Sequence, residues 1–84
     1  MAYYVEWSPR ARQVLKSMEK DLAKRIASKV MDIQFAPYHF VEKLIGENTW
    51  RMRVGDYRVI LDINEPEKKI EVLELGHRKN IYKK

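Results

Sequence analysis

The chain has 84 residues, enough for one small domain with a single hydrophobic core, and we expect that domain to span residues 1–84. Hydrophobic residues make up 45% of it, which excludes intrinsic disorder, and the lack of cysteine excludes disulfides, thiolate zinc sites and a cysteine nucleophile. Its 17 Lys and Arg against 12 Asp and Glu give a net charge of +5, which suits a polyanionic partner such as nucleic acid.

Neither a signal peptide nor a membrane helix is predicted. The first residues lack a basic stretch followed by an apolar run, and no segment approaches the roughly 18 apolar residues that span a bilayer. We therefore expect a cytoplasmic protein.

The N-terminal half predicts one strand followed by two helices. Residues 3–7 form a β-branched and aromatic run that stops at Ser8 and Pro9, a pair that caps a helix and occupies its first position. Apolar residues then recur at helical spacing in two stretches between residues 9 and 36. The second stretch begins near Asp21, and Pro37 is expected to end it because proline cannot continue the helical hydrogen bonds.

Four strands are predicted after a linker at residues 37–40, namely residues 41–45, 49–54, 57–63 and 69–75. Short turn sequences separate them, such as Gly55-Asp56, and short connections favour antiparallel neighbours. The expected fold class is α+β, with an N-terminal strand and two tandem helices packed on a largely antiparallel sheet, in the order β-α-α-β-β-β-β.

The segment TWRMRVGDYRVILDI predicts a hairpin with a defined register. If Gly55 and Asp56 form its turn, Val54 faces Tyr57, and strict alternation then fixes every other pair. One face is apolar, with Trp50, Met52, Val54, Tyr57, Val59, Leu61 and Ile63. On the other face, Arg53 lies opposite Arg58 and Arg51 lies opposite Ile60.

Two interpretations of the three arginines remain open at this point. Like charges directly opposite each other are mildly destabilising, so an anion bound over the face would explain them, and the planar guanidinium matches a phosphate. Alternatively, the face is solvated, the arginine stems cover apolar surface, and one of the charged groups pairs with Glu71.

The C-terminal tail after Leu75 carries four Lys or Arg and no acid. It also holds two acid/base groups, the imidazole of His77 and the phenol of Tyr82. A basic tail also occurs as a solubilising end or a partner contact. His39 is expected to be structural, and neither a metal-ligand spacing nor a Gly-rich phosphate loop is present, so any nuclease chemistry would use no metal or cofactor.

Two motifs in this order resemble the RelE branch of the RelE/ParE toxin superfamily, and the likeness runs over nearly the whole chain. The first is the sequence GDYRVI at residues 55–60, and the second is GHRK at residues 76–79 with Tyr82. The resemblance implies a toxin of a type II toxin–antitoxin system that cleaves messenger RNA in the ribosomal decoding site. It also implies a cognate antitoxin encoded in an adjacent gene.

The resemblance implies catalytic roles for Arg51, Arg53, Arg58, Arg78 and Tyr82, and the RNA-binding set is Arg51, Arg53, Arg58, Arg78 and Lys79. The ribose 2′-hydroxyl would attack the adjacent phosphate, and arginines would stabilise the added negative charge. RelE-type sites often have lysines at the positions of Arg51 and Arg53. Arginine is a poor base, so Tyr82 or His77 would have to transfer protons.

Two alternatives to a ribonuclease stay open. The first is a ParE-like inhibitor of DNA gyrase with no hydrolytic activity. The second is a catalytically weak relative whose basic face only binds RNA.

Overall fold

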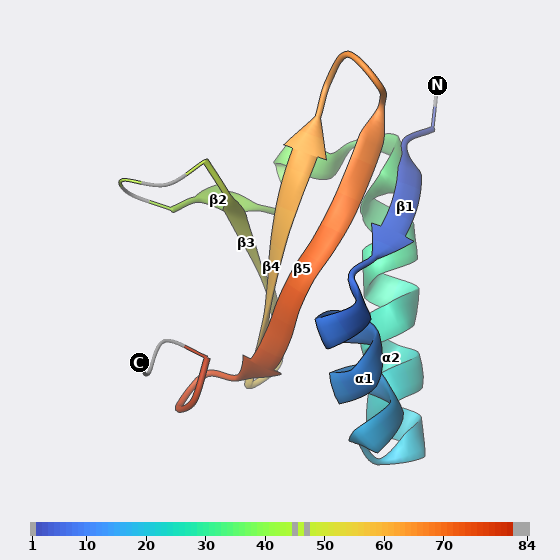
Figure 1. Ribbon diagram of the computed structural model, residues 1–84, viewed down its shortest axis with the longest axis vertical. Helices are drawn as coiled ribbons and strands as arrows, with labels where there is room; N and C mark the ends of the chain where they lie inside the picture. Colours follow the sequence, from blue (N-terminus) through green and yellow to red (C-terminus); the bar gives the residue numbers. More distant parts are fainter. Residues whose placement is uncertain (1, 45, 47, 82–84) are drawn as a thin grey trace.

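A five-stranded sheet carries two helices on one side, and the chain turns toward the other side after its last strand (Figure 1). The computed structural model describes residues 2–44, 46 and 48–81. The strands are β1 (Tyr4–Trp7), β2 (Glu42–Lys43), β3 (Trp50–Val54), β4 (Tyr57–Asn64) and β5 (Lys69–His77). Their order in the sheet is β1-β5-β4-β3-β2, with β1 parallel to β5 and the other neighbours antiparallel. The predicted α+β class and largely antiparallel sheet are confirmed.

Helix α1 (Pro9–Ser17) begins where the sequence predicts. The hydroxyl of Ser8 accepts a hydrogen bond from the backbone N–H of Ala11 at 3.0 Å, and Pro9 occupies the first helical position. The same hydroxyl donates to the carbonyl oxygen of Leu73 at 2.8 Å. Ser8 therefore starts the helix and fixes it beside β5.

Helix α2 (Lys20–Asp32) is shorter than predicted. Two short 3₁₀ helices follow it, η1 (Ile33–Phe35) and η2 (Pro37–His39), so the stretch expected to continue the helix to residue 36 and the expected linker are both tighter turns. The residue before a proline is driven out of helical conformation, and Ala36 has φ −153° and ψ 66°. Proline thus ends the α-helix several residues before its own position.

The predicted hairpin register is confirmed in every pair. Val54 pairs with Tyr57, Met52 with Val59 and Trp50 with Leu61, while Arg53 pairs with Arg58 and Arg51 with Ile60. The apolar face packs against the helices in one core, whose buried members are Ala11, Ile26, Val30, Ile33, Met52, Val54, Val59, Leu61, Ile70, Val72 and Leu75. The face that carries the arginines is called the open face below.

Strands β2 and β5 differ from expectation in length. The strand predicted at residues 41–45 is reduced to Glu42–Lys43, which pairs only with Trp50 and Arg51, and residue 45 lies outside the described residues. Strand β5 instead continues two residues beyond its predicted end, through Gly76 and His77.

An irregularity between Ile60 and Leu61 shifts the register of β5 by one residue. Ile60 pairs with Glu74 and Leu61 with Val72, so Leu73 is the extra residue of a β-bulge. The bulge keeps Val72 and Leu75 both in the core and puts Gly76 opposite Arg58 on the open face.

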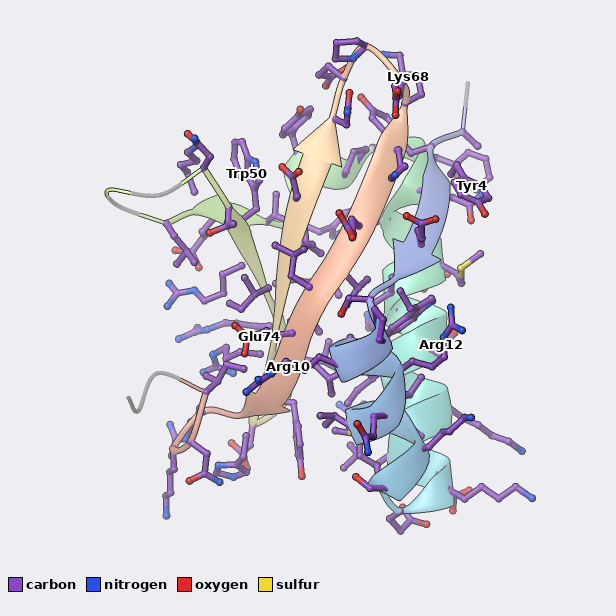
Figure 2. The ribbon with its side chains drawn as sticks, in the orientation of Figure 1. Tyr4, Arg10, Arg12, Trp50, Lys68 and Glu74 are labelled. Atoms are coloured by element: carbon purple, nitrogen blue, oxygen red, sulfur yellow. The ribbon has the colours of Figure 1, made fainter. Side chains whose placement is uncertain are left out.

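Helix α1 starts beside the part of β5 that extends beyond β1. The backbone N–H of Ser8 donates to the carbonyl oxygen of Val72 at 2.9 Å. Arg10 in the first turn of α1 forms an ion pair with Glu74, with Nε and Oε1 3.1 Å apart (Figure 2). The helix and the C-terminal part of β5 are therefore joined next to the tail.

Candidate functional site

One end of the open face gathers the strand arginines and the start of the tail. Arg53 on β3 pairs with Arg58 on β4, and Arg58 pairs with Gly76 on β5, so these positions form one row across the sheet. The tail leaves this end of β5, next to the turn between β3 and β4 (Figure 1). Together with the tail residues Arg78 and Lys79, this row is called the arginine end below.

The two arginines of the row have different environments. Arg53 is exposed, whereas Arg58 is only 7% exposed. Nη1 of Arg58 donates to the carbonyl oxygens of Gly55 at 3.0 Å and Tyr57 at 2.9 Å. The two carbonyl oxygens partly offset the charge of Arg58, which reduces the repulsion expected between like charges in opposite positions.

Arg51 has an acidic neighbour on the short strand β2. Its Nη2 lies 3.3 Å from Oε2 of Glu42, the residue paired with it in the sheet. The sequence suggested Glu71 as an acidic partner for the arginines of this face, but in the structure Glu42 is the acidic partner of Arg51. The sequence did not indicate this partner, because β2 and β3 are separated by a loop of six residues. The register of the pair depends on the conformation of that loop, which the sequence leaves open.

Arg78 is held by the turn between β3 and β4. Its backbone N–H donates to the carbonyl oxygen of Asp56 at 2.8 Å, and its Nε lies 3.9 Å from Oδ1 of the same residue. More than half of the Arg78 side chain is exposed. Asp56 is thus a further residue of the site, which sequence reasoning placed only in the turn.

His77 organises the first residues of the tail. Its ring lies edge-on to that of Tyr57, with centroids 5.5 Å apart, and its Nδ1 accepts a hydrogen bond from the backbone N–H of Lys79 at 3.1 Å. Its carbonyl oxygen accepts from the N–H groups of Asn80 and Ile81 at 2.8 and 3.0 Å, which closes one helical turn. Lys79 is exposed, and Tyr82 lies outside the described residues.

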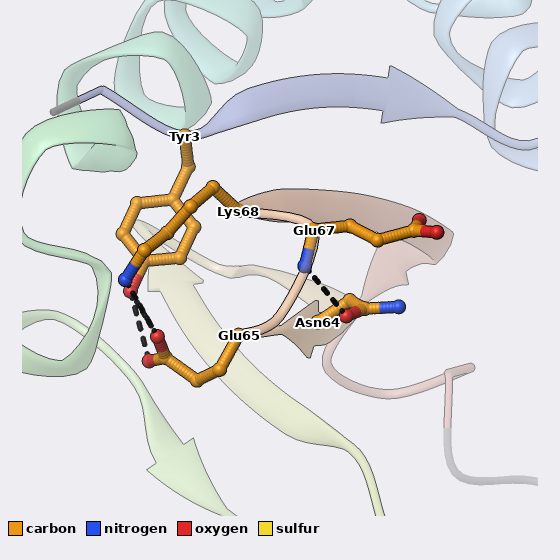
Figure 3. Close-up of polar contacts among 5 residues, drawn as sticks. All are labelled: Tyr3, Asn64, Glu65, Glu67 and Lys68. Carbon is orange, nitrogen blue, oxygen red and sulfur yellow. Dashed lines mark hydrogen bonds and ion pairs between the residues drawn. The ribbon is translucent and has the colours of Figure 1, made fainter.

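A second polar cluster lies at the opposite end of the sheet, in the turn between β4 and β5 (Figure 3). Both carboxylate oxygens of Glu65 are within 2.9 Å of the hydroxyl of Tyr3, and Lys68 Nζ lies 3.0 Å from Oε1. Hydrogen bonds from Tyr38, Lys68 and Tyr3 lower the pKa of Glu65 to about 2. Partial desolvation and the bond to Glu65 raise the pKa of Tyr38 to about 12.

This cluster is structural in character. Tyr3 precedes β1, Tyr38 belongs to η2, and Glu65 belongs to the β4–β5 turn, so Glu65 joins three separate segments. A carboxylate that already accepts hydrogen bonds from two phenols and an ammonium has little capacity left for a substrate.

Metal-ligating side chains do not gather anywhere in residues 2–44, 46 and 48–81 in a group of three or more that could hold an ion. His39, expected to be structural, is exposed, with its ring centroid 6.3 Å from that of Phe40. Of the helices in the described part of the chain, none has the length and apolar character needed to cross a membrane.

Comparison with known proteins identifies the family. The family model for the ParE toxin of the type II toxin–antitoxin system parDE matches residues 5–82. No curated protein matches the chain.

Among solved structures, the chain is similar to a chain of the archaeal RelE–RelB complex from Pyrococcus horikoshii OT3. The identity is 31% and the TM-score 0.81, over 95% of this chain and 99% of that one. A chain of the toxin–antitoxin complex RelBE2 from Mycobacterium tuberculosis gives 22% identity and a TM-score of 0.86, over 93% and 100%. A chain of the intact E. coli RelBE complex gives 16% and 0.78, over 90% and 96%. At these lower identities the last two support the fold alone.

The family match over residues 5–82 and the 31% identity to a chain of an archaeal RelE–RelB complex lead to one conclusion: this chain is a RelE-like member of the RelE/ParE superfamily, the toxins of type II toxin–antitoxin systems.

Proposed function

We propose that this toxin is a ribosome-dependent messenger-RNA endonuclease that inhibits translation in the cytoplasm. The observation that carries the proposal is the row formed by Arg53, Arg58 and Gly76, which brings two strand arginines to the start of a basic tail. Arg53 and Arg78 at this end both have exposed side chains, and the chain has a net charge of +5. These features suit a phosphate of an RNA strand.

In the proposed reaction, the ribose 2′-oxygen attacks the adjacent phosphorus while the bond from phosphorus to the 5′-oxygen breaks. The products are a 2′,3′-cyclic phosphate and a 5′-hydroxyl, with one proton leaving the 2′-oxygen and one arriving at the 5′-oxygen. The transition state carries extra negative charge on the phosphoryl oxygens. Placing cations where that charge develops lowers the barrier, and the ribosome supplies the positioning of the RNA.

Each arginine has a distinct part in this proposal. Arg53 and Arg78 donate hydrogen bonds to the phosphoryl oxygens, because their side chains are exposed. Arg58 is committed to two carbonyl oxygens of the turn, so it acts as a fixed positive charge within the row. Arg51 and Lys79 bind the flanking phosphates of the strand.

Proton transfer is assigned to Tyr82, because arginine stays protonated at any physiological pH. A tyrosine with an ordinary pKa of about 10 becomes a usable base when neighbouring cations lower that value. Nδ1 of His77 accepts a bond from the N–H of Lys79, which occupies one of the two nitrogens that a histidine base could use. We assign His77 to holding the tail and to hydrogen bonding a phosphate through Nε2.

The proposed partners are the ribosome, its messenger RNA and a cognate antitoxin encoded beside this gene. The similar solved structures from Pyrococcus horikoshii, Mycobacterium tuberculosis and E. coli are toxin–antitoxin complexes. An antitoxin segment with acidic side chains would complement the charge of the arginine end. A small open reading frame adjacent to this gene, whose product co-purifies with the toxin, is the expected finding.

The proposal is tested by inducing the toxin alone and mapping the 5′ ends of translated and untranslated copies of one message. Wild type is compared with Arg53→Ala and Arg78→Ala, and Arg12→Ala serves as the matched control because Arg12 is an exposed arginine of helix α1 away from the row and the tail. Cleavage of the translated copy only, lost in the first two variants and kept in the third, supports the proposal. Equal cleavage of both copies contradicts the ribosomal part.

A second candidate function is inhibition of DNA gyrase, which the match to a ParE toxin model favours. A gyrase inhibitor has no need of a phosphate site. Growth arrest with intact messages and trapped gyrase–DNA complexes would support this function over the first.

A further inference from the structure

Gly76 lacks a side chain at a position where a side chain would meet the tail. A Cβ atom added there would lie 3.3 Å from Cδ1 and 3.7 Å from Cβ of Ile81. The positive-φ glycines of the described residues are Gly46 and Gly55, so Gly76 does not serve an unusual backbone conformation. The space that it leaves is filled by Ile81.

This contact lies in the row of the arginine end. Gly76 is paired with Arg58, so Ile81 packs onto the open face at the position next to that buried arginine. The helical turn closed by the carbonyl oxygen of His77 brings Ile81 back over the strand that it has just left. The intervening residues Arg78, Lys79 and Asn80 are exposed, whereas Ile81 is partly buried.

Helix α1 forms the other wall of the same corner. A pocket of about 320 Å³ lies between Arg10 and Val14 of the helix and Asn80 and Ile81 of the tail. The ion pair from Arg10 to Glu74 lies at this pocket (Figure 2). Ile81 thus adds an apolar contact at the corner where helix, strand and tail meet.

From these contacts we infer that Ile81 is a positioning residue, which holds the tail over Gly76 so that Arg78 and Lys79 lie at the arginine end. The inference rests on the proposed function for its catalytic consequence. Arg78 is then held from both sides, by the hydrogen bond from its N–H to Asp56 and by the packing of Ile81 on Gly76 three residues later, which is called the Ile81 seat below. Misplacement of a catalytic group by about 1 Å can slow a reaction about a hundredfold, so loss of the seat should slow cleavage by about ten- to a hundredfold.

The first test compares Ile81→Ala with Ile81→Leu, and uses Ile63→Ala as the control because Ile63 is also partly buried but pairs with Ile70 at the other end of the sheet. Amide hydrogen exchange at residues 78, 80 and 81 measures how firmly the tail is held, and it does not depend on catalytic activity. Single-turnover cleavage at saturating programmed ribosomes measures its consequence. Ile81→Ala should exchange faster and cleave more slowly, Ile81→Leu should behave like wild type, and Ile63→Ala should keep both tail protection and cleavage rate.

A compensating pair makes the test specific to the contact. Gly76→Ala places its methyl against Cδ1 of Ile81, and Ile81→Val removes that atom while keeping Cβ at ordinary contact distance. Gly76→Ala alone should speed exchange at residue 78, and the double variant with Ile81→Val should restore protection.

The outcomes separate the inference from the proposed function. If exchange is unchanged in Ile81→Ala, the contact of Ile81 with Gly76 does not hold the tail. If exchange is faster but the cleavage rate is unchanged, Ile81 has no positioning role in the reaction. If wild type cleaves no message on ribosomes, the proposed function fails and the positioning role falls with it, while the exchange results still decide whether Ile81 holds the tail.

Discussion

Arg53 and Arg58 occupy directly opposite positions on β3 and β4, but one side chain is exposed and the other is folded back onto its own turn. The hydrogen bonds from Arg58 to Gly55 and Tyr57 give that arginine a structural task in addition to any effect of its charge. Neighbouring residues of identical type are therefore expected to respond differently to the same substitution.

Arg58→Ala should lower the free energy of unfolding by about 1–3 kcal/mol, because two turn carbonyls lose their donor in a partly buried position and the buried stem of Arg58 is removed. Urea denaturation measures this. Arg53→Ala is the control, and its surface position limits the expected change to about 0.5 kcal/mol. Equal unfolding midpoints for the two variants would contradict the structural role of Arg58.

Arg53→Ala should instead lower the cleavage rate on the ribosome by about 10²–10³-fold, the usual effect of removing one donor to a developing negative charge. Single-turnover cleavage of a programmed message measures it. Arg53→Lys keeps the charge and should recover part of the rate. A normal rate in a well-folded Arg53→Ala variant would remove this residue from the proposed mechanism.

Glu42→Gln should strengthen the binding of single-stranded RNA, because it removes the carboxylate that lies 3.3 Å from Arg51. The slope of log K against log salt should become steeper, since the carboxylate of Glu42 no longer competes with phosphate at Arg51. Fluorescence anisotropy over a series of KCl concentrations gives both values. The exposed ion pair contributes at most about 1 kcal/mol to stability, so folding should be nearly unchanged. Weaker binding or an unchanged slope would refute the idea that Glu42 competes with RNA.

The pKa of Glu65 predicts a loss of stability in acid. Hydrogen bonds from Tyr38, Lys68 and Tyr3 lower it to about 2, so the folded state favours the ionised form. The stabilisation is complete above the ordinary pKa of 4.5 and disappears as the pH falls from there towards 2. Urea midpoints between pH 2.5 and 6 should fall less steeply in Glu65→Gln than in wild type. Parallel curves for the two proteins would show that the cluster does not couple folding to pH.

The sequence predicts best the elements whose geometry is local. Ser8 and Pro9 define the start of α1 through a cap that involves only the next turn. Alternation around Gly55 and Asp56 defines the hairpin, since a slip by one residue would bury the arginines. These patterns therefore place Arg51, Arg53 and Arg58 on one face without knowledge of the rest of the fold.

Features that depend on distant partners could not be predicted in the same way. The extension of β5 to His77 follows from pairing with β4, and the bulge at Leu73 accompanies a bond to Ser8, 65 residues away in the sequence. The burial of Arg58 likewise requires three-dimensional information, because alternation indicates only the face on which a side chain begins. Asp56 and Glu42 likewise belong to the site because of contacts with Arg78 and Arg51 that only the folded chain brings about.

The parallel pairing of β1 with β5 also sets the order in which this toxin can mature during its own synthesis. Strand β1 is made first, but its neighbour in the sheet of the described residues is β5, with Tyr4 beside Lys69. Strand β5 lies between β1 and β4, so the sheet is completed by the strand translated last. The two helices and the strands β2 to β4 can form earlier, but the row that ends at Gly76 does not exist until β5 has left the ribosome. The arginine end is therefore assembled only when the last strand of this fold joins the sheet.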